Sequence, residues 1–373
     1  METRSKYRPG RVRDAIVTVL EHCDTPMGVR EIHRLTTTQL GEAVPASSVR
    51  SSLALNEAGL FRRVRRGQYM LNGFEAQAPM SVPRSEVWRW SSTELHQGDC
   101  VGWLRSCPPN TIHGVVTDPP YGLVEYEPGQ LEKMRARSGG VWRIPPSFDG
   151  HERSPLPRFT TLSDLDRQAL TIFFQNWAHA LMPVLVHGAN VVVASNPLLS
   201  FLVSGALASA GFERRGEIVR LVMTMRGGDR PKNAHDEFSG VSVMPRSMWE
   251  PWLLFRKPLE GRVQDNLRKW RTGGFRRISE SQPFGDVIAS HPTRAHERRL
   301  APHPSLKPQA FLRQVVRAVL PLGEGVVLDP FAGAGSTLAA AETVGYPSIG
   351  VELNPDYFAL AREAVPRLTE FKC

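Results

Sequence analysis

Residues 326–337 read V-V-L-D-P-F-A-G-A-G-S-T, and this stretch decides the fold. An apolar run that predicts a buried strand ends at Asp329, two glycines follow, and the alanine-rich sequence after Thr337 predicts a helix. Glu352 closes the next predicted strand about 20 residues later. Glycines let a nucleoside approach the backbone, and such an acid accepts hydrogen bonds from ribose hydroxyls. The stretch therefore predicts an α/β fold with a nucleoside site.

A second stretch, T-D-P-P-Y-G at residues 117–122, follows another apolar run. Proline fixes φ and cannot donate to a sheet ladder, so two prolines end a strand and hold the backbone in one extended shape. The turn thereby presents a carboxylate, a carbonyl and an aromatic ring together. By itself this pattern is more typical of an ordinary strand-ending turn.

Short β-branched runs alternate with helical stretches over most of the chain. Helices are predicted at 167–183 and 309–320, and strands at 114–117, 189–195, 217–224, 252–255, 325–328 and 348–351. Such alternation is typical of a Rossmann-like, doubly wound, mostly parallel sheet.

The amino-acid composition limits which classes of binding partner and which compartment are expected. A formal charge of +9 and a pI near 9.7 favour a polyanion, with nucleic acid ahead of an anionic membrane surface. The four cysteines lack metal-ligand spacing, so neither a metal site nor a disulfide framework is predicted, and a reducing cytoplasm fits best. The apolar stretch 189–210 is interrupted by polar residues, which argues against a membrane span, and no secretion signal opens the sequence.

The N-terminal region has its own pattern. Helical spacing at 11–23 and 29–39, a third helix starting near Ser47 or Ser48, and two strands within 60–71 predict a winged helix-turn-helix in residues 1–75. Residues 1–70 carry 12 Arg and Lys against 7 Asp and Glu. We expect DNA contacts from the third helix and the basic wing turn, or else a protein-docking or dimerisation module. The candidate DNA-binding residues here are Ser48, Arg50, Arg62, Arg63, Arg65 and Arg66.

Residues 76–93 are predicted to be a linker, and residues 94–373 a single catalytic domain. Four motifs of this domain are D-P-P-Y at 118–121, F-A-G-A-G-S-T at 331–337, G-D-C at 98–100 and H-P-S-L-K-P at 303–308. Together they resemble the amino-group DNA methyltransferases that use S-adenosylmethionine. The D-P-P-Y motif precedes the glycine motif, which resembles the circularly permuted β group of that family. In the family fold, the strands that carry these two motifs are central neighbours.

The resemblance implies roles for particular residues. Asp118 and the Pro119 carbonyl would each accept an N–H of the target amine, Pro120 would keep them fixed, and Tyr121 would stack on a base flipped out of the duplex. Glu352 would bind the ribose of S-adenosylmethionine and Asp99 its adenine. The other cofactor-binding candidates are Cys100, Asp118, Ser305, Lys307, Asp329, Phe331, Gly333, Gly335, Ser336 and Thr337.

Target recognition is expected in two further segments. Residues 122–160 are predicted to form a mobile loop over the flipped base, with a plain surface insertion as the alternative. Residues 256–300 carry 11 Arg and Lys against 5 Asp and Glu and occupy the family's target-recognition position. This segment is short, so 227–246 or the winged helix is expected to help. Its candidate DNA-binding residues are Arg268, Lys269, Arg271, Arg276 and Arg277.

These patterns predict a cytoplasmic, site-specific DNA methyltransferase that modifies adenine N6 in double-stranded DNA. Asp118 favours adenine within the family, and cytosine N4 is the alternative. Methylation of RNA or a protein amide, or a non-catalytic DNA-binding regulator, are further alternatives. A cognate restriction endonuclease is a candidate partner, and the chain is expected to be a monomer or homodimer. Cytosine C5 chemistry is rejected because the sequence lacks its Pro-Cys nucleophile.

Overall fold

The chain divides into two compact units, Met1–Arg84 and Ser85–Cys373. The structure is a computed structural model that describes residues 11–21, 23, 25–55, 60–65, 67–71, 86–120, 164–222, 230–231 and 233–373. Tyr121, Arg66 and the predicted loop 122–160 lie outside the described residues, as does part of 227–246. None of the described helices is both long enough and apolar enough to cross a membrane.

The smaller unit contains three helices and a three-stranded antiparallel sheet of order β1-β3-β2. Its elements are α1 (Arg11–Glu21), β1 (Met27–Gly28), α2 (Val29–Leu40), α3 (Ala46–Leu55), β2 (Phe61–Arg65) and β3 (Gln68–Leu71). Ile16, Ile32, Leu53 and Phe61 are fully buried in one core that joins all three helices to the sheet. The helices and hairpin thus occur in the predicted order, and β1 is an additional strand that the sequence pattern did not indicate.

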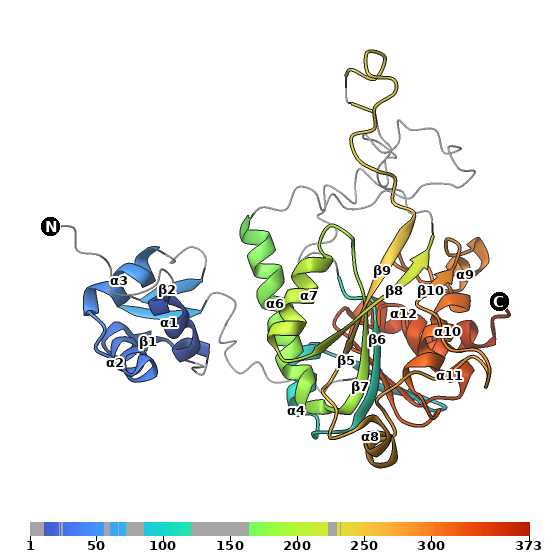
Figure 1. Cartoon of the computed structure of the whole chain (residues 1–373), viewed down its shortest axis with the longest axis horizontal. Helices are drawn as coiled ribbons and strands as arrows, with labels where there is room; N and C mark the ends of the chain where they lie inside the picture. The colour runs from blue at the N-terminus through green and yellow to red at the C-terminus, as the bar shows by residue number, and fades with distance from the viewer. Residues whose placement is uncertain are drawn as a thin grey trace. The chain divides into compact units, whose positions relative to one another are not determined.

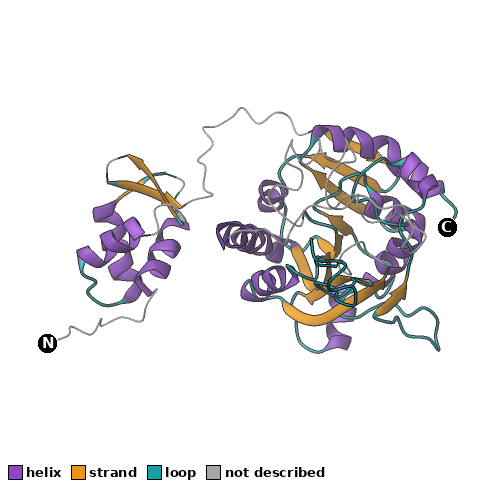
Figure 2. Cartoon of the chain, turned by 90° about the horizontal axis from the view of Figure 1, so that it is seen from above, coloured by secondary structure: helices purple, strands orange, loops and turns teal. Residues whose placement is uncertain are grey.

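The larger unit is built on one sheet with helices on both faces (Figures 1 and 2). Its strands are β4 (Val87–Trp90), β5 (Thr93–Gln97), β6 (Ile112–Thr117), β7 (Leu185–Ala194), β8 (Glu213–Leu221), β9 (Trp249–Arg256), β10 (Val287–Ala289), β11 (Val327–Asp329) and β12 (Ser348–Glu352). Its helices are α4 (Cys100–Ser106), α6 (Asp164–Val184), α7 (Ser200–Ser209), α8 (Val263–Trp270), α9 (Ala295–Leu300), α10 (Gln309–Val319), α11 (Ser336–Val344) and α12 (Pro355–Glu370).

The strand order among the described residues is β10-β8-β9-β7-β6-β11-β12-β5-β4. Strands β7, β6, β11, β12 and β5 are parallel neighbours, whereas β9 and β4 each run antiparallel to the strands beside them. The sheet is therefore mostly parallel, as predicted. Leu328 pairs with Val115, so the strands of the glycine motif and the D-P-P-Y motif are central neighbours.

The alternation of side chains explains why helices cover both faces. Val115 packs into the core with α4, α6 and α7, while the next residue, Val116, packs into the core with α10 and α11. Successive residues of a strand point to opposite faces, so a strand that is apolar throughout needs a helical layer on each side. The result is a three-layer α/β/α unit whose strand ends carry the polar motifs.

Two predictions about segments need correction. Residues 87–90 were assigned to the linker, but they form β4, which pairs with β5 through Trp88 and Leu95. A short aromatic strand beside a tight turn has too little periodicity to be separated from linker sequence. The strand predicted at 217–224 is also displaced: β8 begins at Glu213 and ends at Leu221.

Candidate active site

Four acids lie at the carboxyl ends of four adjacent parallel strands. Asp118 follows β6, Asp329 ends β11, Glu352 ends β12 and Asp99 follows β5 after Gly98. Neighbouring parallel strands bring their carboxyl ends to one edge of the sheet, here called the carboxyl edge. The four acids therefore lie at the same edge of the sheet.

Asp329 joins the ends of the two central strands. It is buried, and its Oδ1 accepts the Thr117 hydroxyl at 2.7 Å and the Phe331 N–H at 3.1 Å. Burial raises the pKa of Asp329 to about 6, although its bonds from Thr117 and Thr337 act in the opposite direction. Since Thr117 precedes Asp118, this bond fixes the start of the D-P-P-Y segment against the glycine motif.

The glycine turn needs glycine at both positions. Gly333 has φ +51° and Gly335 has φ +77°, a region that residues with a Cβ rarely adopt. A Cβ on Gly335 would also lie 2.3 Å from Val365 Cγ2. The turn ends at Ser336, the first residue of α11, so the backbone N–H groups at the start of that helix lie beside the strand end.

Glu352 holds this turn in place. Its carboxylate accepts the N–H of Gly333 and the N–H of Asn354, each at 2.7 Å. Burial raises the pKa of Glu352, while these backbone bonds act in the opposite direction. Gly98 donates its N–H to the Glu352 carbonyl at 2.9 Å, which brings the G-D-C motif to the same strand end.

The G-D-C motif begins a helix. Asp99 is the N-cap of α4, and its exposed carboxylate accepts the Gly102 N–H at 2.6 Å. Cys100 is buried, and burial raises the pKa of its thiol to about 12. Cys100 is therefore an uncharged thiol at neutral pH and a poor nucleophile.

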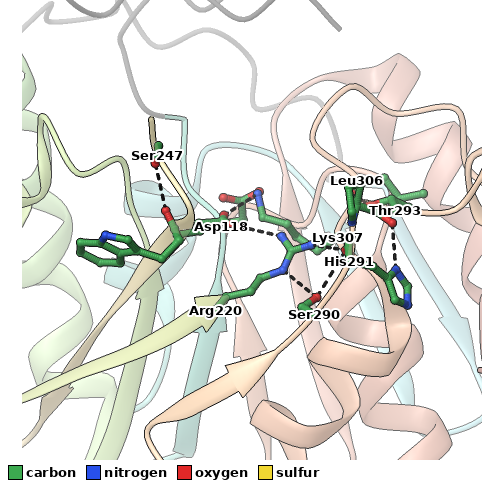
Figure 3. Close-up of polar contacts among 11 residues, drawn as sticks. Asp118, Arg220, Ser247, Ser290, His291, Thr293, Leu306 and Lys307 are labelled. Atoms are coloured by element: carbon green, nitrogen blue, oxygen red, sulfur yellow. Dashed lines mark hydrogen bonds and ion pairs between the residues drawn. The ribbon is translucent and has the colours of Figure 1, made fainter. Parts of the chain in front are cut away.

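Behind Asp118 lies a row of buried charges (Figure 3). Lys307 Nζ lies 2.8 Å from Asp118 Oδ2 and 3.0 Å from Glu250 Oε1, and Arg220 Nη1 lies 2.6 Å from Glu250 Oε2. Burial alone would lower the pKa of Lys307, but the two carboxylates raise it overall. Burial alone would raise the pKa of Glu250, but Lys307 and Arg220 lower it overall. Lys307, which the resemblance assigned to cofactor binding, is thus paired with the candidate catalytic acid.

His303 of the H-P-S-L-K-P motif lies over the glycine turn. Its Nε2 would be 3.2 Å from a Cβ on Gly333, and its Nδ1 accepts the Ser305 N–H. Its ring makes a T-shaped contact with Tyr357, with the ring centres 4.4 Å apart. Burial, and secondarily the charge of Lys307, lower the pKa of His303 to about 4. The imidazole is therefore neutral across the physiological range and shapes the turn as an uncharged ring.

Three residues at this edge were missed from the sequence: Arg220, Glu250 and, as a residue with a role, His303. Arg220 and Glu250 face each other across β8 and β9. A single charge inside an apolar strand was the available signal, but the partner depends on the register of two antiparallel strands. His303 lies in the H-P-S-L-K-P motif, for which the resemblance implies roles only for Ser305 and Lys307.

The basic candidates of segment 256–300 lie elsewhere. Asn266 of α8 donates to the carbonyl of His187 near the start of β7, so α8 lies at the opposite edge of the sheet, here called the amino edge (Figure 1). Five predicted DNA-binding side chains contact partners within this region. Arg268 pairs with Asp265, Lys269 with Glu260, Arg271 with Glu324, Arg276 donates to Tyr346 and Arg277 to the Ser279 carbonyl. The fold does not bring them to Asp118.

The residues between β8 and β9 leave from the carboxyl edge instead, since β8 ends at Leu221 and β9 begins at Trp249 there. Figure 1 shows this segment extending beyond the ends of the strands. Its described part includes several exposed apolar side chains, namely Phe238, Val241, Val243 and Met248. Apolar groups held in solvent beside a candidate site are typical of a binding surface.

In the smaller unit, the predicted DNA-binding residues have mixed exposure. Arg62, Arg63 and Arg65 are exposed on β2, Arg50 is exposed on α3, and Ser48 is half-buried. The exposed arginines are placed where a polyanion has access to them.

The carboxyl edge fits a nucleoside that carries a positive charge. Two glycines form the turn after the strand, a buried acid on the neighbouring strand accepts the Gly333 N–H, and the edge carries four carboxylates. In the described part of the chain, no group of three or more His, Cys, Asp and Glu side chains is arranged to hold a metal ion.

Comparison with known proteins gives the family of the chain. The family described as DNA methylase matches residues 112–363, which is more than half of the chain. The Type II methyltransferase M.HindIII of Haemophilus influenzae is 23% identical over 291 residues, which cover 72% of this chain and 93% of that protein.

Two solved structures are similar in outline. The TTHA0409 protein of Thermus thermophilus, in complex with S-adenosyl-L-methionine, is 22% identical with a TM-score of 0.46 and covers 74% of this chain and 94% of that one. The cytosine-N4-specific PvuII DNA methyltransferase is 15% identical with a TM-score of 0.48 and covers 75% and 92%.

Proposed function

The chain belongs to the DNA methylase family, and we propose that it transfers the methyl group of S-adenosyl-L-methionine to the exocyclic N6 of a flipped adenine in double-stranded DNA. The observation that carries this proposal is the position of Asp118. It lies directly after β6, beside the strand of the glycine turn, with its carboxylate held by Lys307. A methyl acceptor bound at Asp118 would adjoin a nucleoside bound at that turn.

The chemistry follows from the acceptors at the end of β6. The lone pair of an aromatic amine is delocalised into the ring, so a catalyst has to localise it on nitrogen. The Asp118 carboxylate and the backbone carbonyl of Pro119 accept the two N–H groups and direct the lone pair toward the methyl donor. Pro119 is buried, which fixes that carbonyl, and we assign Pro120 the same supporting role. Tyr121, which lies outside the described residues, is proposed to stack on the flipped base.

The cofactor is assigned to the glycine side of the edge. We assign Glu352 to its ribose, Asp99 and the backbone of Cys100 to its adenine, and the glycine turn to its methionine part. The remaining contacts proposed around the methionine part are Ser305, Asp329, Phe331, Gly333, Gly335, Ser336 and Thr337. When bound, S-adenosyl-L-methionine supplies a methyl group on a positively charged sulfur.

Adenine N6 is favoured over cytosine N4 because the resemblance associates aspartate at position 118 with adenine. Cytosine N4 is the second candidate, since the same two acceptors serve either amine. The order of the motifs along the chain leads us to place the protein in the circularly permuted β group. The relative M.HindIII is a Type II methyltransferase, which makes a cognate restriction endonuclease a candidate partner. We also propose the cytoplasm as its location.

DNA recognition is assigned to three parts of the chain. We propose that residues 1–75 form a winged helix whose exposed Arg62, Arg63 and Arg65 contact phosphates. The segment between β8 and β9 is proposed to read the target, because it leaves from the carboxyl edge. Segment 256–300 is proposed to contribute only through its last residues, which return to that edge at β10.

The test is expression of the full chain in a bacterial host that lacks DNA methylation, followed by mass spectrometry of the nucleosides in its DNA and RNA. N6-methyladenine in DNA is expected, and its level should fall sharply in cells that carry the Asp118→Ala variant. N4-methylcytosine would keep the mechanism and change the base. A methylated base found only in RNA, or no methylated product, would contradict the proposed DNA activity.

A further inference from the structure

Three charged side chains from three separate parts of the chain stand in line behind Asp118. Lys307 precedes α10, Glu250 lies on β9 and Arg220 lies on β8. Their side chains are only 11%, 11% and 6% exposed, and Figure 3 shows Lys307 and Arg220 beside Asp118. Including Asp118, the charges alternate in sign along the row. Opposite charges are therefore adjacent at every contact.

Arg220 is the fixed end of the row. Its Nε donates to Ser290 Oγ at 3.0 Å, its Nη1 to Glu250 at 2.6 Å and its Nη2 to the His291 carbonyl at 2.9 Å. Its guanidinium also lies 5.2 Å from the centre of the Phe311 ring. A planar guanidinium group that is bound through each of its nitrogens has one orientation. One oxygen of Glu250 is therefore fixed in space.

Glu250 transfers this constraint to Lys307. With Oε2 held by Arg220, Oε1 faces the Lys307 ammonium at 3.0 Å. A lysine side chain has four flexible carbons, and by itself it would hold a neighbouring acid in many geometries. Between Glu250 and Asp118, the ammonium is restricted to a position that satisfies both carboxylates.

The constraint ends at the catalytic group. Lys307 contacts Oδ2 of Asp118, and that contact sets which way the other oxygen of the carboxylate points. Catalysis needs one Asp118 oxygen aimed at an amine N–H, and a misplacement of about 1 Å costs about 100-fold in rate. Buried ion pairs are a weak source of stability compared with apolar packing, so stability alone is a poor explanation for four buried or half-buried charges here.

We propose that Glu250 and Arg220 are positioning residues for the methyl transfer, and that they act through Lys307 to orient the Asp118 carboxylate. The inference rests on the proposed function, because it concerns the same catalytic acid. It assigns the three residues a role distinct from cofactor binding. Loss of the Glu250 charge should then affect the chemical step and leave the affinities for substrate and cofactor nearly unchanged.

The same two strands provide a matched control. Glu213 of β8 and Arg256 of β9 form a second cross-strand pair at the amino edge, with Nη2 2.6 Å from Oε2. Glu250→Gln and Glu213→Gln therefore make the same chemical change in the same strand pair, at opposite edges of the sheet. The conservative variant Glu250→Asp keeps the charge with a shorter side chain.

The experiment measures kcat and the KM values for DNA and S-adenosyl-L-methionine, together with Tm, for the full-length wild type and these three variants. We expect Glu250→Gln to lower kcat about 100-fold, with both KM values within about twofold of wild type. Glu213→Gln should retain kcat, and Glu250→Asp should recover part of the loss.

Equal kcat values for Glu250→Gln and Glu213→Gln would overturn the inference and leave the proposed function intact, provided the wild type methylates DNA. A rise in KM for the cofactor with unchanged kcat would overturn it in favour of a cofactor-binding role. If Glu250→Gln does not fold, Arg220→Lys makes the same test, since it keeps the charge but loses the fork and should also lower kcat. A wild type that methylates no DNA would overturn both proposals.

Discussion

At the amino edge of the sheet Glu213 pairs with Arg256, and at the carboxyl edge Arg220 pairs with Glu250 on the same two strands. The amino-edge pair is connected to the backbone, because Arg256 also donates to the Gly273 carbonyl. The carboxyl-edge pair continues through Lys307 to Asp118, a side chain that is 16% exposed. The two ion pairs are chemically alike, so their roles have to be judged from the groups to which they lead.

At the amino edge, polar side chains donate hydrogen bonds to backbone carbonyls of neighbouring segments. Lys257 donates to the Leu185 carbonyl, Asn190 to the Gly274 carbonyl and Asn266 to the His187 carbonyl. At the carboxyl edge, polar groups instead surround the glycine turn and the end of β6. We therefore expect substitutions at the amino edge to change stability, and substitutions at the carboxyl edge to change activity.

The largest effect should come from Asp118→Ala. Loss of the carboxylate removes one of two acceptors of the target amine, and kcat should fall by about 10²–10³-fold. Binding of S-adenosyl-L-methionine, measured by calorimetry, should persist because the glycine turn and Glu352 are unchanged. A variant that retains its methylation rate would break the assignment of chemistry to this edge.

The opposite result is expected for Asn266→Ala at the amino edge. Asn266 is fully buried, and its amide accepts the Glu260 N–H and donates to the carbonyls of His187 and Thr272. Its removal leaves buried backbone groups without partners and should lower the free energy of unfolding by about 3 kcal/mol. Denaturant titration measures this loss, and kcat per folded molecule should stay at the wild-type value. A specific fall in kcat would extend function to this edge.

Two double variants test whether DNA is bound by the winged helix or by the amino edge of the sheet. Arg62→Gln with Arg63→Gln should reduce the salt dependence of DNA binding by about two counterions, since each phosphate contact contributes about one. Arg268→Gln with Lys269→Gln should leave that slope unchanged, because both side chains are paired at the amino edge. The measurement is the affinity for duplex DNA across a salt series. A smaller salt dependence seen only in the second double variant would instead assign target recognition to segment 256–300.

The smallest effect concerns Asp329. Its pKa is raised to about 6 in the folded chain and is about 3.9 when unfolded, so the unfolded state ionises first as the pH rises. The stabilisation from the uncharged Asp329 carboxyl is therefore present below about pH 4, and the wild type loses it as the pH rises to about 6. Asp329→Asn keeps an acceptor for Thr117 and Phe331 and does not ionise. Its Tm relative to wild type should rise by a few degrees from pH 5 to pH 7, and a constant difference would contradict the raised pKa.

Several parts of the site were predictable because local sequence determines them. Asp118 and Asp329 each follow a short apolar run, and Gly333 and Gly335 occupy a turn that needs positive φ. The adjacency of their strands followed from the family resemblance and agrees with the pairing of Leu328 with Val115. Local pattern and parallel topology were sufficient for these residues.

Other parts depend on contacts between distant segments. The partnership of Arg220, Glu250 and Lys307 requires the register of β8 and β9 and the path of the chain before α10. The basic character of residues 256–300 was visible, but not the fact that α8 packs beside the start of β7. Charge counts report which residues are present, whereas the edge that they occupy is a property of the folded sheet.

The irregularity between Arg214 and Gly216 has a consequence for how β8 and β9 find each other. From Glu213 to Arg220 the chain advances one residue further than from Glu250 to Arg256, and the β-bulge takes up that residue. Without the bulge, a strand aligned at Glu213 would place Val219 opposite Glu250, and Arg220 would point to the other face. A slipped alignment therefore leaves charges without partners at one edge or both, so the two ion pairs together favour the register that the bulge sets.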